Sequence, residues 1–83
     1  MHWKYYEIVL NEKGGGNMIG GRIKNYLEDK GIKQRFVADK AGLTVSAMSD
    51  ICNEKRKVDA VEYYMICKAL AVPLDFFLEG IEL

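Results

Sequence analysis

Few residues of this chain could carry out covalent or metal chemistry. Its 83 residues include one histidine, His2, and two cysteines, Cys52 and Cys67, which do not form a C-x-x-C motif. A tetrahedral zinc site needs more ligands than these, and a nucleophilic serine or cysteine needs a histidine partner. The glycines at 14–16 precede Asn and Met rather than the Lys-Ser/Thr of a phosphate loop. We therefore expect a binding module with no enzyme activity, no cofactor, no metal and no small-molecule substrate.

The run Lys55-Arg56-Lys57 has the clearest binding chemistry in the sequence. Three adjacent cations can bind phosphate groups, but such a run also occurs in solvated surface loops. A basic run that directly follows a DNA-docked helix lies where backbone phosphates are contacted. The interpretation of this run therefore depends on the residues before it.

Those preceding residues have the spacing of a helix-turn-helix. Ala38 lies four residues before Gly42, which Leu43, Met48 and Ile51 follow. The small alanine lets the second helix cross closely, the glycine permits a positive φ in the turn, and the three apolar residues fill the crossing. Helix-turn-helix units place the second helix in the major groove of DNA. An ordinary helical hairpin is the alternative.

Helical periodicity predicts the elements that hold this unit. Thr44 suits an N-cap, Asp59 with Glu62 suits a capping box, and Pro73 suits the start of a short last helix. The expected helices cover residues 18–30, 33–41, 45–52, 60–70 and 74–78. We expect an all-α fold, a compact five-helix domain. Its expected inward residues are Ile19, Ile23, Tyr26, Leu27, Val37, Ala38, Ala41, Met48, Ile51, Cys52, Ala60, Tyr63, Ile66, Cys67, Leu70, Phe77 and Leu78.

Residues 19–79 resemble the Cro/phage-repressor-type (lambda-repressor-like) helix-turn-helix family. The family pattern combines Arg-Ile-Lys, Gln-x-x-hydrophobic-Ala, Gly-Leu-Ser/Thr, Lys-Ala-Leu-Gly-Val and a short final helix like Asp-Glu-Leu. The corresponding segments here are Arg22-Ile23-Lys24, Gln34 to Ala38, Gly42-Leu43-Thr44, Lys68-Ala69-Leu70-Ala71-Val72 and Asp75-Phe76-Phe77-Leu78. The resemblance implies a five-helix domain that binds double-stranded DNA, usually as a homodimer on a pseudo-palindromic operator.

The resemblance also implies which residues contact DNA. The positions that would read bases lie on the exposed face of the second helix of the unit: Val45, Ser46, Ser49 and Asp50. The positions that would contact backbone phosphates are Gln34, Thr44, Asn53, Lys55, Arg56 and Lys57.

Three departures from the family pattern affect these expectations. Leu27 and Cys52 replace an Arg and a Glu that pair in many relatives, so we expect an apolar contact there. Glu54 replaces a frequent glycine, which requires either a strained backbone at Asn53 or Glu54 or a longer helix. The reading positions also lack Arg, Gln and Asn, the strong bidentate readers of bases.

We expect a sequence-specific transcriptional regulator, a repressor of phage or mobile-element type, that binds as a dimer. The weak reading positions support an alternative, which is a protein-interaction module of the same fold, antitoxin-like or an adaptor, with weak DNA binding. Exposed apolar residues favour a covered surface, either a dimer contact or a site for the N-terminal segment. They are Phe36, Val61, Tyr64, Met65 and Phe76.

Residues 1–17 differ from the rest and are expected to form an extended segment with a glycine-rich linker, before a domain over residues 18–83. Two interpretations stay open. Residues 13–18 can be encoded by a purine-rich ribosome-binding sequence followed by ATG. Met18 would then be the natural or an alternative translation start, and residues 1–17 would be a translated upstream segment that is not native to the protein. Alternatively, the segment is a strand that pairs across a dimer.

The net charge of zero conceals an uneven distribution. Residues 22–57 contain nine basic and five acidic residues, a net charge of +4, whereas residues 58–83 have a net charge of −4. The local field, rather than the total, steers a charged partner. No run approaches the roughly 18 apolar residues of a membrane span, and no signal pattern opens the chain, so a cytoplasmic location is expected.

Overall fold

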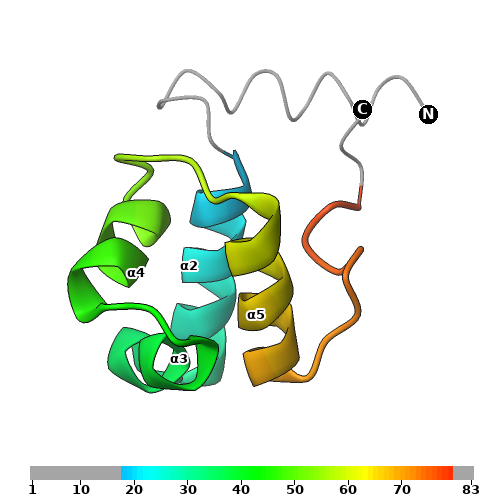
Figure 1. Cartoon of the computed structure of the whole chain (residues 1–83). Coiled ribbons are helices and arrows are strands. Elements are labelled where there is room, and N and C mark those ends of the chain that lie inside the picture. The colour runs from blue at the N-terminus through cyan, green and yellow to red at the C-terminus, as the bar shows by residue number, and fades with distance from the viewer. Residues whose placement is uncertain (1–17, 80–83) are drawn as a thin grey trace.

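The computed structural model describes residues 18–79, which contain four helices and no strand. The helices are α2 (Met18–Lys30), α3 (Gln34–Ala41), α4 (Val45–Cys52) and α5 (Ala60–Leu70). They surround one core, and the segment after α5 returns alongside that helix (Figure 1). The all-helical character is confirmed for this part of the chain. The extended segment expected over residues 1–17 lies outside the described residues.

Local sequence explains where two of the helices begin. The Oγ1 atom of Thr44 accepts a hydrogen bond from the backbone N–H of Ala47 at 3.0 Å. Asp59 and Glu62 form the expected capping box, since each side chain accepts from the other residue's backbone N–H. These bonds satisfy N–H groups that have no partner inside a helix.

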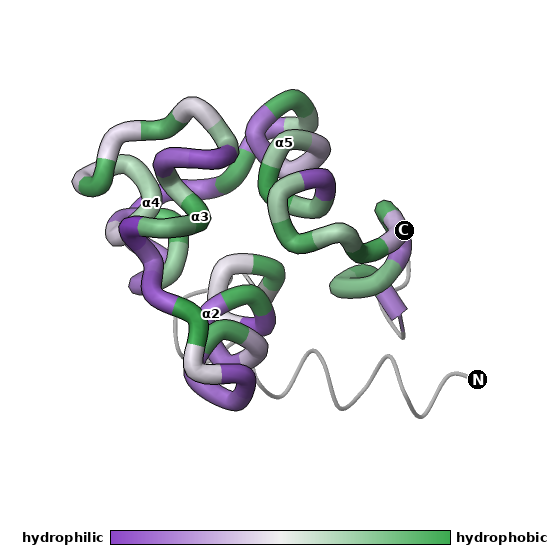
Figure 2. Tube along the Cα trace, turned by 90° about the horizontal axis from the view of Figure 1, so that it is seen from below, coloured by the Kyte–Doolittle hydropathy of each residue, from purple (hydrophilic) through white to green (hydrophobic). Residues whose placement is uncertain are grey.

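Every helix contributes to one apolar core (Figure 2). Its buried members are Ile23, Leu27, Val37, Ala38, Ala41, Met48, Ile51, Cys52, Ile66, Cys67 and Phe77. All eleven were expected to point inward. Leu27 and Cys52 are both buried, as expected of the pair that replaces an Arg and a Glu. The prediction for Ala60 was wrong, because this first residue of α5 is exposed, and Tyr63, Leu70 and Leu78 are only partly buried.

The close crossing of α2 and α4 depends on a residue without a side chain. A Cβ atom added to Gly20 would lie 2.0 Å from the carbonyl oxygen of Ile51. Atoms cannot approach to that distance, so any larger residue at position 20 would push the two helices apart. This contact fixes how α4 is held against the rest of the domain.

The short helix expected over residues 74–78 is not formed, and turns occupy residues 74–79 instead. The N–H groups of Phe76 and Leu78 bond to carbonyls three residues back, at 3.0 Å in each case. So short a segment gains little from helical hydrogen bonds, and tertiary contacts decide its path.

Contacts with α2 and α5 hold these turns in place. The Arg22 guanidinium donates to the carbonyls of Phe77, at 3.3 Å, and Glu79, at 2.7 Å. The Tyr63 hydroxyl donates to the carbonyl of Leu74. The buried Phe77 ring lies edge-on to Tyr26, Tyr63 and Phe76. None of the helices in residues 18–79 is long and apolar enough to cross a membrane.

Candidate nucleic-acid interface

The α3–turn–α4 unit has the geometry that its spacing predicted. Gly42 ends α3 with a φ of 75°, in the left-handed region that glycine adopts without strain. The next N–H, that of Leu43, bonds to the carbonyl of Ala38 at 2.8 Å and closes the turn. The chain then enters α4 at the Thr44 cap, so two helices of eight residues are joined through a tight turn.

The two sides of α4 differ sharply. Met48, Ile51 and Cys52 are buried against the core. The four residues expected to read bases lie on the other side and define what we call the reading face: Val45, Ser46, Ser49 and Asp50. The first two of them are exposed and the last two are half-buried. Residues spaced i, i+1, i+4 and i+5 share one side of a helix, so these side chains can approach a partner together.

The expected phosphate contacts lie at both ends of this reading face. Gln34 is the first residue of α3 and Thr44 precedes α4, where backbone N–H groups point outward and favour anions. Thr44 Oγ1 accepts from Ala47, so its hydroxyl hydrogen can still be donated. Beyond the far end of α4, Lys55 and Lys57 are exposed.

The turn after α4 has the strained backbone that the sequence predicted. Glu54 has a φ of 59°, and the N–H of Lys55 bonds to the carbonyl of Asp50 at 2.8 Å. The left-handed conformation costs a residue with a side chain about 1–2 kcal/mol. The carboxylate of Glu54 lies against Gly21, because a Cβ added there would be 2.3 Å from Glu54 Oε2.

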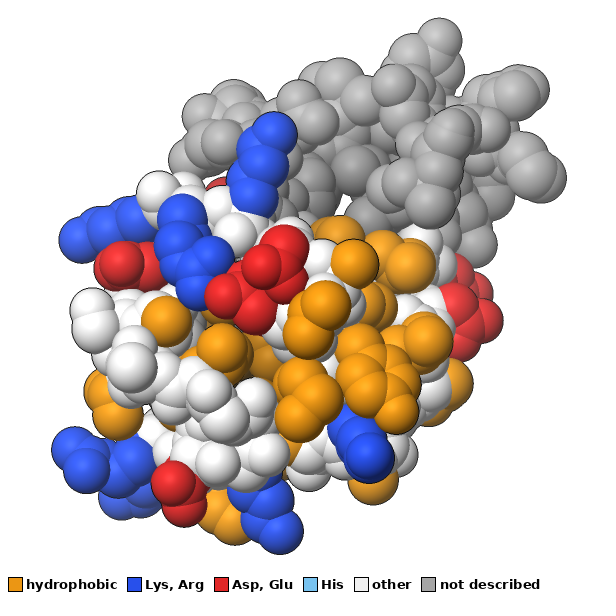
Figure 3. Space-filling view, in the orientation of Figure 1, with side chains coloured by type: hydrophobic (Ala, Val, Ile, Leu, Met, Phe, Trp, Pro, Cys, Tyr) orange, Lys and Arg blue, Asp and Glu red, His pale blue; other side chains and the backbone are white. Residues whose placement is uncertain are grey.

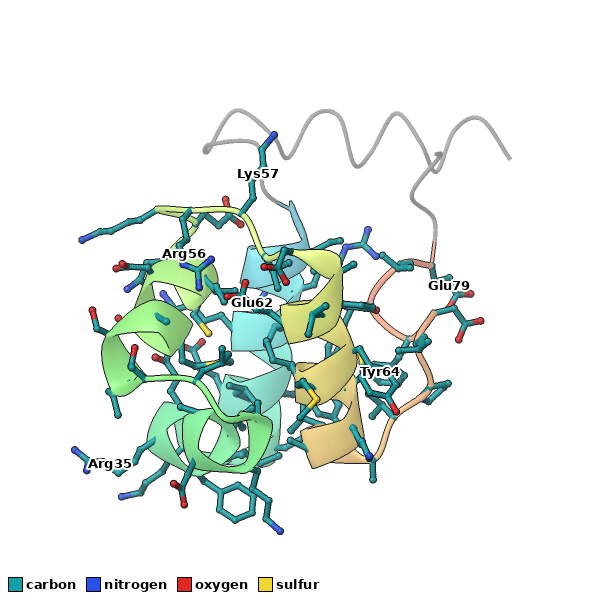
Figure 4. The ribbon with its side chains drawn as sticks, viewed as in Figure 1. Arg35, Arg56, Lys57, Glu62, Tyr64 and Glu79 are labelled. Atoms are coloured by element: carbon teal, nitrogen blue, oxygen red, sulfur yellow. The ribbon has the colours of Figure 1, made fainter. Side chains whose placement is uncertain are left out.

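Arg56 differs from its lysine neighbours because its charge is already paired. Its guanidinium donates to Glu62 Oε1 at 3.1 Å and to Oε2 at 2.7 Å (Figure 4). A third bond, 3.2 Å long, goes to the carbonyl of Lys57. This pairing, above all the hydrogen bonds from Arg56, holds the pKa of Glu62 below its ordinary value. Arg56 therefore joins the turn to α5 and has less charge to offer a phosphate.

The structure adds two cations that the sequence analysis had not singled out. Lys33 and Arg35 line a groove of about 490 Å³ with Phe36, Asp39, Leu43 and Val45. Lys and Arg side chains gather near both ends of α4 in Figure 3, with Arg35 below α4 in Figure 4. The only signal in the sequence was the excess of basic residues in 22–57, which did not tell which of them lie beside α4.

Comparisons with known proteins agree with this geometry. A family model described as helix-turn-helix matches residues 23–77, which include the whole α3–α4 unit and the turns up to Phe77. No curated protein sequence matches the chain significantly. The matched segment covers more than half of the chain. The chain therefore belongs to the Cro/phage-repressor-type helix-turn-helix family, whose members are regulators that bind double-stranded DNA.

Proposed function

We propose that this chain is a sequence-specific transcriptional repressor of phage or mobile-element type that binds operator DNA as a homodimer. The observation that carries the proposal is the reading face of α4, which has four outward side chains and exposed lysines at the turn that follows. A helix with this exposure fits the width of the major groove. The DNA-binding unit would be the domain over residues 18–83.

Each proposed contact follows from chemistry. Val45 can touch a thymine methyl group, Ser46 and Ser49 can hydrogen-bond base edges, and Asp50 can accept from a cytosine amino group. Phosphates would be bound by Gln34, Thr44, Asn53 and the residues at 55–57, which set the register of the domain on the duplex. Among those last three, the exposed lysines contribute most, because Arg56 is paired with Glu62.

Dimerisation would supply a second reading helix. Two copies of α4 in successive major grooves would lie about 34 Å apart. A surface for the contact is available, because Val61 is 70% exposed and Leu74 is 51% exposed, with Tyr64 and Phe76 also exposed. Val61 and Tyr64 lie on α5, whereas Leu74 and Phe76 lie in the turns that follow it, and we call these four residues the apolar patch of α5. Figure 3 shows hydrophobic side chains, in orange, gathered over α5. An apolar patch of this kind marks a contact surface. A dimer bound over a promoter would repress by excluding polymerase.

The salt dependence of binding tests the DNA part of the proposal. The logarithm of the affinity for duplex DNA should fall with the logarithm of the salt concentration, by about 0.9 per phosphate neutralised. Lys57→Glu should weaken binding and reduce this slope by about 1. The matched control is Lys68→Glu, an equal charge change on α5, which should leave the slope unaltered. Equal effects of the two variants, or binding without salt dependence, would contradict the proposal.

Sedimentation of a second pair of variants tests the dimer. Val61→Asp should produce monomers at concentrations where the unmodified chain is dimeric. Phe36→Asp makes the same kind of change at a residue of α3 that is 51% exposed, and it should leave the dimer intact. A monomeric unmodified chain would contradict this part of the proposal.

A second candidate function is a protein-interaction module of antitoxin or adaptor type. It is supported by the absence of Arg, Gln and Asn from positions 45–50 and by the apolar patch of α5. It predicts DNA affinity that is weak, independent of base sequence and insensitive to Lys57→Glu.

A further inference from the structure

A line of three polar side chains runs from α2 to the reading face. The Lys24 ammonium on α2 donates to Asn53 Oδ1 at 3.4 Å, and Asn53 Nδ2 donates to Ser49 Oγ at 3.2 Å. Asn53 is the C-cap of α4, and its backbone N–H also bonds to the carbonyl of Ser49 at 2.9 Å. Lys24 and Asn53 line one hollow beside α2, together with Glu28, Cys52 and Glu54. We call the three side chains the Lys24–Asn53–Ser49 relay.

The chemistry of the lysine fixes the direction of every bond in this relay. An ammonium group has three donors and no acceptor, so the amide of Asn53 must turn its oxygen toward Lys24. The amide NH₂ then faces Ser49 and can only donate to it. The Ser49 hydroxyl therefore accepts from Asn53, and its own hydrogen must point elsewhere. A hydroxyl has one hydrogen to donate, so this hydrogen is available on the side away from Asn53.

We propose that Lys24 and Asn53 are positioning residues that set base preference by making Ser49 a hydrogen-bond donor. This inference rests on the proposed DNA-binding function. In the major groove, guanine N7 and O6, adenine N7 and thymine O4 accept hydrogen bonds, whereas cytosine N4 and adenine N6 donate them, and cytosine alone offers a donor without an acceptor. Because Asn53 already occupies one of the two lone pairs of Ser49 Oγ and the hydroxyl hydrogen is free to point at the DNA, Ser49 favours a base with an acceptor at the position it reaches. A serine without this relay would serve either kind of base.

The relay makes an unusual prediction about one substitution. Asn53→Asp replaces the donating NH₂ by an oxygen that can only accept, so Ser49 must turn its hydrogen toward the new carboxylate. Only lone pairs of Ser49 then face the base, and the preference moves to bases with a donor, cytosine above all. A single hydrogen bond has a net value of about 1 kcal/mol, so the change in preference at that position is about fivefold.

Selection of bound sites from random duplex DNA by the full-length chain tests the relay. Ser49→Ala should abolish the preference at one base position and leave the others, which identifies the position that Ser49 reads. Asn53→Asp should move the preference at that same position toward cytosine, and Lys24→Met should weaken it. Lys68→Met is the matched control for Lys24→Met, because it removes an exposed lysine of α5, outside the hollow that Lys24 and Asn53 line, and should alter nothing.

The outcomes separate this inference from the proposed function. Sequence-selective binding with the same preference in Asn53→Asp and in the unmodified chain would overturn the relay alone. No selection of any sequence by the unmodified chain would overturn both. A measurement without DNA gives an independent check, because Lys24→Met and Ser49→Ala should each shift the side-chain NH₂ resonances of Asn53. Unchanged resonances in both variants would also overturn the relay.

Discussion

Arg56 donates two hydrogen bonds, of 3.1 and 2.7 Å, to the carboxylate of Glu62. This pair connects the turn after α4 to the first turn of α5. The same carboxylate accepts the backbone N–H of Asp59 at 3.1 Å. One side chain thus completes the capping box and anchors the segment that contains the proposed phosphate contacts. The position of Lys55 and Lys57 relative to α4 depends on this junction.

The first prediction concerns the pH dependence of this junction. Because Glu62 has a lowered pKa when folded, its ionised form stabilises the fold above the pKa of an unfolded glutamate, about 4.3, and this stabilisation is lost as the pH falls through the folded pKa. Glu62→Gln should therefore lower the free energy of unfolding at pH 7, by no more than about 1 kcal/mol since the pair is partly exposed.

Urea denaturation at several pH values measures this effect. The difference between Glu62→Gln and the unmodified chain should persist down to about pH 5 and shrink steadily below it. The control is Asp75→Asn, a change in the exposed turns at a residue that forms no ion pair within residues 18–79. A difference that stays constant between pH 7 and pH 3 would contradict the ionic role of Glu62.

The second prediction concerns Ala71, where the family pattern has glycine. Ala71 ends α5 with a φ of 59°, in the left-handed region. Its N–H bonds to the carbonyl of Lys68 at 3.1 Å, so the strained conformation closes the helix. Ala71→Gly should relieve the strain and raise the free energy of unfolding by about 1 kcal/mol.

Urea midpoints of two variants check this assignment. Ala69→Gly, two residues earlier inside α5, should lower the free energy of unfolding by about 1 kcal/mol, because glycine is a poor helix former. We expect the two glycine substitutions to change the free energy of unfolding in opposite directions. Destabilisation by both would mean that Ala71 is not held in the left-handed region.

The third prediction concerns the two thiols. Burial raises the pKa of Cys52 to about 11, with Lys24 opposing the shift and Glu28 adding to it, and burial also raises the pKa of Cys67. Only the thiolate reacts with alkylating agents, and at pH 8 the Cys52 thiol, with a pKa of about 11, is ionised in about one molecule in a thousand. Both cysteines should therefore react with iodoacetamide only as fast as the domain unfolds.

Mass spectrometry of the alkylated chain over time gives these rates. Labelling should become fast and complete once urea passes the unfolding midpoint. Rapid modification of either cysteine under native conditions would contradict this prediction, because it would show that the thiol is accessible in the folded domain.

Local signals made much of the fold predictable. Thr44 and the Asp59–Glu62 pair mark helix starts through bonds spanning three residues, and Gly42 marks a turn that few other residues could adopt. The strain at Glu54 was also predictable, because the family pattern has glycine there. In each case the deciding contact lies within a few residues along the chain.

The missed features depend on contacts that no local pattern encodes. The turns at 74–79 replace a helix because Arg22, 55 residues away from Phe77, binds their carbonyls. The pairing of Arg56 with Glu62 could not be predicted without knowing the path of the turn between α4 and α5. The relay from Lys24 to Asn53 joins residues 29 positions apart, so its direction could be worked out only from the packed helices.

The most direct test of the central claim is a map of the residues that contact DNA. Backbone amide resonances of the full-length chain should be followed while duplex DNA of mixed sequence is added. The account predicts that the largest shifts occur at residues 45–50 of α4 and at the turn over 53–57, with smaller ones at Lys33 and Gln34. Residues 61–68 of α5 should change little. Shifts concentrated on α5, with α4 unaffected, would contradict the claim that α4 is the surface that reads DNA.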